Sequence, residues 1–140
     1  MRYKYLEDVA LADVAFESYG ESAEECICNA GLALEDVQAD LATVELAVTR
    51  RMSFQAPAYE DLLLAFLEEL VYLKDAQQLV FAEFSVQIKG SGPYTLEIAA
   101  RGSHLDDAVK QKTDVKAVTR HLFTIKKMQD QWVARVVLDV

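Results

Sequence analysis

The chain has 140 residues, of which 52% are hydrophobic, with only five glycines and two prolines. This length and composition predict a single globular domain spanning residues 1–140. The net charge of −9 disfavours direct binding to a phosphate backbone but suits metal cations or a basic protein partner. Neither a signal peptide nor an apolar run of roughly 20 residues, the length that crosses a bilayer, is present, so we expect a cytoplasmic protein without a membrane segment.

The first part of the chain predicts two strands followed by a helix. Polar and apolar residues alternate over 2–6 and over 13–19, which is typical of short strands. Ser22 is a favourable N-cap, and Glu25 stands three residues later, as in a capping box. The apolar positions that follow recur with helical spacing, so the first helix is predicted to end at about Gln38.

The middle of the chain predicts a strand and a second helix. Residues 41–54 alternate and are rich in β-branched residues, which favours a strand. Pro57 suits the first turn of a helix, and an apolar stripe then continues to about residue 76. Lys74 lies near the end of this helix, where a positive charge is favourable to the helix dipole.

The last part of the chain predicts two β-hairpins. Alternation in the first hairpin places Val80, Phe84 and Ile88 on one face, and its turn contains "GSGP". The second hairpin turns at "MQDQ". The four strands are expected at 79–90, 93–102, 115–127 and 131–140.

The resulting order is β-β-α-β-α-β-β-β-β. Because hairpins dominate, we expect an α+β fold with a largely antiparallel β-sheet and two amphipathic helices packed on it.

Common catalytic signatures are absent from the sequence. It contains no Gly-rich phosphate loop and no GxSxG motif. Cys26 and Cys28 are two residues apart on a predicted helix, so they do not face each other, and we interpret them as buried small hydrophobic residues. The histidines, His104 in a polar loop and His121 in a strand, form no evident ligand set.

Carboxylates at the ends of two predicted strands are the remaining candidates. Asp13 begins the second strand and Asp139 ends the last one. If these strands are antiparallel neighbours, Asp13, Asp139 and the α-carboxylate of Val140 share one corner. Clustered carboxylates in apolar surroundings do not all stay ionised without a partner, and Ca²⁺ or Mg²⁺ would provide one. The alternative is that Asp139 only makes a sheet edge soluble.

Four segments form a pattern known from a protein family. They combine an acid-led strand and Glu-Glu helix, a leucine-rich helix with Glu, a Lys-Ala-Val-Thr strand, and an end made of aspartate and one aliphatic residue. The chain thereby resembles the archease family, small proteins that assist the RNA ligase of tRNA splicing, over most of its length. The segments are "ADVAFESYGESAEECICNAGLAL" (12–34), "LLLAFLEELVYLKD" (62–75), "DVKAVTRHLF" (114–123) and "VARVVLDV" (133–140).

The chain departs from the family pattern before the second strand. The family usually reads Asp-His-Thr-Ala-Asp there, whereas this chain has Val9, Ala10 and Leu11 in place of His and Thr, with one residue more between Asp8 and Asp13. The resemblance therefore assigns the family aspartate to Asp13 and does not extend to Asp8.

The resemblance implies a site and a set of roles. A divalent metal, reported in the family as calcium, is implied to bind Asp13, Asp139 and Val140. Glu69 and Lys116 are implied to matter for action on the ligase. From the residues alone, Glu69 is equally consistent with a salt-bridged helix acid, and Lys116 with a solvated lysine at a strand end.

The implied function is that of a non-catalytic accessory protein. Its partner would be an RNA ligase that joins a 3′-phosphate or 2′,3′-cyclic-phosphate end to a 5′-hydroxyl with GTP and Mn²⁺. The accessory protein would promote guanylylation of the ligase and multiple turnover, without stably binding nucleic acid itself. Two alternatives stay open: a metal-dependent phosphoesterase, and a chaperone-like adaptor for RNA-modifying enzymes.

Overall fold

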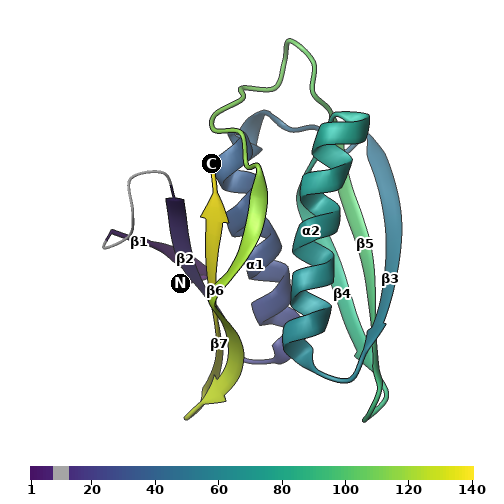
Figure 1. Cartoon of the computed structure of the whole chain (residues 1–140). Coiled ribbons are helices and arrows are strands. Elements are labelled where there is room, and N and C mark those ends of the chain that lie inside the picture. The colour runs from purple at the N-terminus through teal and green to yellow at the C-terminus, as the bar shows by residue number, and fades with distance from the viewer. Residues whose placement is uncertain (8–12) are drawn as a thin grey trace.

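The structure, a computed structural model, describes residues 1–7 and 13–140 and contains two α-helices and seven strands (Figure 1). All strand pairings are antiparallel, in the orders β1-β2-β7-β6 and β3-β5-β4. The expected α+β class and element order are confirmed, and the strands divide between two sheets. The elements are β1 (Tyr3–Leu6), β2 (Asp13–Gly20), α1 (Ala23–Gln38), β3 (Val48–Ala56), α2 (Tyr59–Gln77), β4 (Leu79–Lys89), β5 (Tyr94–His104), β6 (Ala117–Met128) and β7 (Gln131–Asp139).

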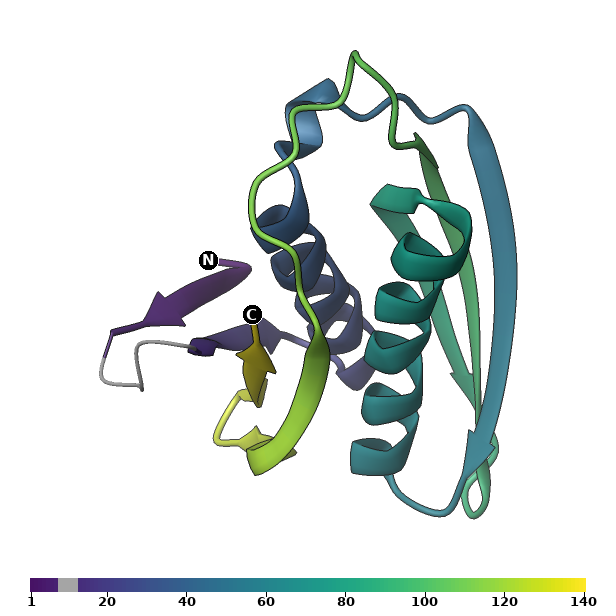
Figure 2. The same ribbon diagram turned by 45° about the horizontal axis from the view of Figure 1, so that its top comes forward.

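The two helices lie between the two sheets (Figures 1 and 2). Helix α1 packs on β2 and β4, and α2 packs on β6 and β3, so each helix contacts both sheets. Their apolar sides and the inner faces of the sheets share one main core. This arrangement places the outer faces and the edges of both sheets at the surface.

The start of α1 follows the sequence signal closely. The Ser22 hydroxyl accepts a hydrogen bond from the Glu25 amide at 3.1 Å, as the predicted cap requires. The Glu25 carboxylate accepts from the Glu21 amide at 3.3 Å, one residue before the position expected in a capping box. Further along, Gly31 permits close helix contact, because a Cβ there would lie 2.7 Å from the Phe66 ring.

The strand predicted over 41–54 was wrong in its first half. Asp40 instead begins a short 3-10 helix, Leu41–Thr43, because its carboxylate accepts a hydrogen bond from the Ala42 amide at 3.1 Å. The strand begins only at Val48. A local side-chain cap thus outweighed the strand propensity of the β-branched residues that follow.

The prediction that Val80 lies on the same face of the first hairpin as Phe84 was also wrong. A shift of register between Phe81 and Glu83 turns Phe81 and Phe84 toward the main core and places Val80 in a separate small cluster. The Phe81 amide at this irregularity donates a 2.6 Å hydrogen bond to the buried carboxyl group of Glu35. This hydrogen bond links α1, through Glu35, to β4.

Glu35 is an ionisable group inside the core. Its other carboxyl oxygen accepts a 2.6 Å hydrogen bond from the Gln38 amide group. Burial raises the pKa of Glu35 to about 8, although the hydrogen bonds from Phe81 and Gln38 and the charge of Lys74 act in the opposite direction. Folding therefore favours the protonated form of this carboxyl group.

The position of Glu35 predicts a pH dependence of stability. Between pH 4.5, the ordinary pKa of a glutamate, and about pH 8, the Glu35 carboxyl group is protonated to a greater extent in the folded state than in the unfolded state. The stabilising contribution of the protonated carboxyl group is therefore complete below about pH 4.5 and is lost as the pH rises through about 8. We expect the wild type to lose free energy of unfolding relative to Glu35→Gln from about pH 5 to about pH 9. Urea titrations at each pH measure this difference, and parallel curves for the two proteins would contradict it.

Candidate functional site

Strands β2 and β7 lie side by side (Figure 1), and their antiparallel register places Asp13 directly opposite Asp139. Asp13 is the first residue of β2, and Asp139 is the last residue of β7. Cβ atoms of residues directly opposite in an antiparallel pair lie about 4.5–5.5 Å apart. The expected adjacency of the two strands is therefore confirmed, and the two carboxylates belong to one corner of the sheet.

The surroundings of this corner are apolar on one side. Ala15 and Val137, the next pair on the same face of the strands, are 1% and 3% exposed, whereas Asp13 and Asp139 are half-buried. Within residues 1–7 and 13–140, no lysine, arginine or histidine forms an ion pair with either aspartate. Two carboxylates thus stand side by side at the rim of an apolar patch.

The backbone of Asp139 is held from both sides. Its register partner on β6 is Ala117, and its carbonyl accepts a 2.8 Å hydrogen bond from the Lys116 amide. Val140 follows and packs partly against the main core. This end of β7 is therefore an ordered part of the sheet rather than a loose end.

The donor atoms at the corner suit a hard cation. The described residues contain no group of three or more His, Cys, Asp or Glu side chains that could hold a metal ion. Asp13 and Asp139 supply two carboxylates, and Val140 adds main-chain oxygen, all of the donor type that Ca²⁺ and Mg²⁺ prefer. Asp8 lies outside the described residues. The role of Asp13, Asp139 and Val140 as metal ligands stays a prediction.

Lys116 lies beside the corner because contacts with α2 hold the segment that leads into β6. The side chain of Lys116 is exposed, directly before the start of β6. The preceding residue, Val115, accepts a 3.1 Å hydrogen bond from the Lys74 ammonium group, which also pairs with Asp114 and, at 3.0 Å, with Asp75. Lys74 is only 8% exposed. Its place near the end of α2 predicted only a lysine that complements the helix dipole, although it falls four residues after the buried Leu70 on the same stripe.

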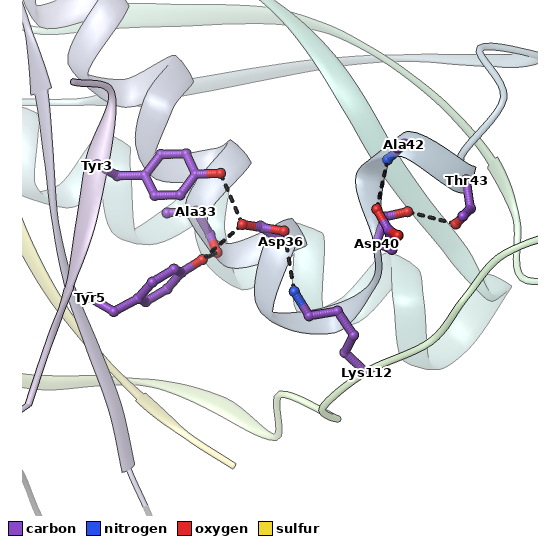
Figure 3. A network of polar contacts seen from close by, with 8 residues as sticks. All are labelled: Tyr3, Tyr5, Ala33, Asp36, Asp40, Ala42, Thr43 and Lys112. Carbon is purple, nitrogen blue, oxygen red and sulfur yellow. Dashed lines mark hydrogen bonds and ion pairs between the residues drawn. The ribbon is translucent and has the colours of Figure 1, made fainter.

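A second group of contacts ties the same segment to α1 (Figure 3). Tyr3 and Tyr5 of β1 donate hydrogen bonds to the Asp36 carboxylate at 3.1 and 3.5 Å, and Lys112 lies 3.3 Å from it. Burial, followed by the charge of Asp36, raises the pKa of Tyr3 to about 12. The Tyr5 hydroxyl also donates to the Ala33 carbonyl at 2.9 Å. Sequence patterns gave no signal for this network, because its members come from three separate segments.

Glu69 lies away from the carboxylate corner. It is half-buried, as expected from its place beside the apolar stripe of α2. It lines a groove of about 190 Å³ between α2 and β3, together with Met52, Phe54 and Leu73. Lys116 is attached to the other sheet, so the structure does not bring these two candidate residues together.

The chain is a two-sheet α+β protein in which the ends of two antiparallel strands bring two aspartates to one corner. Residues 3–140 match the sequence profile of a family described as "Archease protein family (MTH1598/TM1083)", and the chain belongs to this family. It is 34% identical to protein archease of Methanosarcina barkeri, with 99% of this chain and 96% of that protein covered. It is 36% identical to protein archease of Pyrococcus furiosus, with 92% and 93% covered.

Solved structures agree with this assignment. The solution structure of Methanobacterium thermoautotrophicum protein 1598 matches with a TM-score of 0.87 and 31% identity, covering 99% of both chains. A crystal structure from Thermotoga maritima, described as an archease and possible chaperone, matches with a TM-score of 0.60, covering 94% of this chain and 93% of that one. At 22% identity the second likeness shows the fold alone.

Among the described residues, neither helix combines the length and the apolar character that crossing a bilayer requires.

The opposition of two like charges predicts a stability effect at the corner. Like charges directly opposite in a sheet destabilise it, and partial exposure limits the effect to a few tenths of a kcal/mol. In low salt with EDTA, Asp139→Asn should therefore raise the free energy of unfolding, whereas the control Asp107→Asn, in an exposed turn, should not. Urea denaturation measures both. A loss of stability in Asp139→Asn would indicate that the carboxylate already has a stabilising partner.

Proposed function

We propose that the chain is a non-catalytic accessory protein of an RNA ligase that joins a 3′-phosphate or 2′,3′-cyclic-phosphate end to a 5′-hydroxyl in tRNA splicing or RNA repair. It promotes guanylylation of the ligase and allows each ligase molecule to turn over repeatedly. Membership of the archease family supports this proposal. The structural observation that carries it is the placement of Asp13 opposite Asp139 without a cationic partner among the described residues.

In this proposal the corner holds a divalent cation, calcium, through the Asp13 and Asp139 carboxylates and main-chain oxygen of Val140. When bound, the ion neutralises the paired carboxylates and presents positive charge where phosphate oxygens can approach. The protein's own contribution is positional. The two neighbours of β7 hold Asp139 in register with Asp13, and the half-exposed placement leaves the corner accessible to a partner.

Lys116 and Glu69 act on the ligase at different places. Lys116 is exposed and its amide bonds to the Asp139 carbonyl, so it neighbours the corner, and its positive charge suits a phosphate group in the ligase site. Glu69 belongs to the groove between α2 and β3 and contacts the ligase protein there. The net charge of −9 complements a basic groove built for RNA, so the protein reaches the ligase without binding RNA itself.

A chaperone-like adaptor for RNA-modifying enzymes is the second candidate, and a Thermotoga maritima protein of the same fold is described as a possible chaperone. In that case the carboxylate corner would serve folding stability only. Loss of Asp139 would then lower stability and leave ligase activation intact.

The test is multiple-turnover ligation with the cognate ligase at limiting concentration. We expect the wild type to raise the amount of product formed per ligase molecule. Asp139→Asn and deletion of Val140 should reduce this stimulation by about 10- to 100-fold, the range that follows loss of groups that tune a metal site. Asp107→Asn is the matched control and should retain it.

The other outcomes separate the alternatives. Full stimulation by folded Asp139→Asn would exclude the corner as the working site and favour the adaptor. Hydrolysis of phosphoesters by the protein alone would favour a metal-dependent phosphoesterase. Thermal melts of each variant establish that the fold is intact.

A further inference from the structure

The four edge strands of the two described sheets differ in how they are protected. β1 has only four residues, and β6 and β4 each contain a register shift, between Thr119 and Thr124 and between Phe81 and Glu83. Short strands and bulges are common means of preventing another strand from pairing with an edge. β3 pairs with β5 over all nine of its residues without a shift. Among the described edges, only β3 therefore offers an uninterrupted row of backbone groups with which another strand can pair.

The backbone groups that face outward along β3 follow from its hydrogen bonding. The Gly102 carbonyl accepts a 2.9 Å hydrogen bond from the Ala47 amide, so Gly102 directs its backbone toward β3. Its register partner Val48, and every second residue after it, therefore bonds to β5. The intervening residues direct N–H and C=O away from the sheet, and no other described segment runs along that side in Figures 1 and 2. These residues are Thr49, Arg51, Ser53 and Gln55.

The edge is positively charged in an acidic protein. Arg50 and Arg51 have no ion pair with any described residue, whereas Arg101 on the neighbouring strand lies 3.0 Å from Glu83. A carboxylate on an added strand would find a partner in Arg51, whose side chain is exposed on the outer face. The edge thus favours an acidic segment.

The inner side of the same edge provides room for a side chain. The apolar side chains of Met52, Phe54 and Leu73 line the groove of about 190 Å³ between β3 and α2. Polar residues complete its lining: Arg50, Arg51, Ser53, Glu69 and Gln77. Successive side chains of a strand point to opposite faces. A strand added to β3 would therefore direct one residue into this groove and the next toward Arg51.

We propose that β3 is a docking edge to which the partner protein adds an extended segment as a further strand, with an apolar side chain in the groove and a carboxylate beside Arg51. Strand addition obtains affinity from main-chain hydrogen bonds and specificity from pockets for alternate side chains. The inference rests on the proposed function, which supplies the RNA ligase as the partner. A second copy of this chain is a poorer occupant, because two-fold pairing of β3 with itself would bring the arginines of both copies onto one short stretch.

Hydrogen exchange of the β3 amides tests the backbone pairing without any substitution. In the free protein, the outward amides of Thr49, Arg51 and Ser53 should exchange fast, and the inward amides of Arg50 and Met52 slowly. Saturation with the cognate ligase should slow the outward set by at least about tenfold, the effect of one added hydrogen bond per amide. Unchanged outward rates in a bound complex would overturn the proposal. Slowing that depends on the concentration of the protein alone would assign the edge to a second copy and would also overturn it.

The matched substitution is Ser53→Pro against Ser53→Thr. Proline removes an N–H that faces away from the sheet, and edge strands tolerate it there. Ser53→Pro should raise the dissociation constant for the ligase by about tenfold, while Ser53→Thr should not. At saturating concentration Ser53→Pro should still support full ligation, because the carboxylate corner is untouched. Arg51→Glu, which keeps every backbone group, should weaken binding even if the proline variant unfolds.

The outcomes distinguish this inference from the proposed function. If the wild type stimulates ligation while Ser53→Pro and Arg51→Glu bind the ligase normally, only the docking edge is excluded. If the wild type neither binds nor stimulates the ligase, both proposals fail together.

Discussion

The position of β7 inside its sheet is the constraint on which the candidate site depends. β7 pairs with β2 on one side and β6 on the other, so its final residues are fixed by two neighbours. The same pairing brings Asp13, near one end of the chain, opposite Asp139, near the other. Two carboxylates separated by most of the sequence thereby become neighbours at the rim of an apolar patch. The candidate metal site at the corner depends on this register.

The structure separates two surfaces of opposite character. The carboxylate corner belongs to the sheet β1-β2-β7-β6, and the arginine-bearing edge belongs to β3-β5-β4, with both helices between the sheets (Figure 2). Lys116 stands at the first surface and Glu69 at the second. This arrangement suits an accessory protein that binds its partner through the β3 edge and acts through the carboxylate corner.

Much of this fold was predictable because its signals are local. Hydrophobic spacing gave both helices, Ser22 gave the start of α1, and the turn residues gave both hairpins. Acidic residues at the ends of two predicted strands indicated the corner. The pairing of β2 with β7 had to be assumed, since no local pattern specifies a contact between residues so far apart in sequence.

The features that escaped prediction arise from tertiary context. Asp40 diverts the chain into a 3-10 turn by a side-chain hydrogen bond that competes with strand propensity. The irregularity after Phe81 is stabilised by Glu35, a residue 46 positions away. The role of Lys74 depends on the loop that leads to β6. Each case needs a partner that only the folded chain brings near.

A calcium titration of the isotopically labelled protein, followed by its amide resonances, tests the proposed metal site most directly. We expect the amide resonances of Asp13, Asp139 and Val140 to shift together with one dissociation constant, and that of Lys116 to follow because its amide bonds to the Asp139 carbonyl. Asp139→Asn should abolish these shifts. Shifts confined to other acidic residues, with the ends of β2 and β7 unchanged, would contradict the assignment of the corner as the metal site.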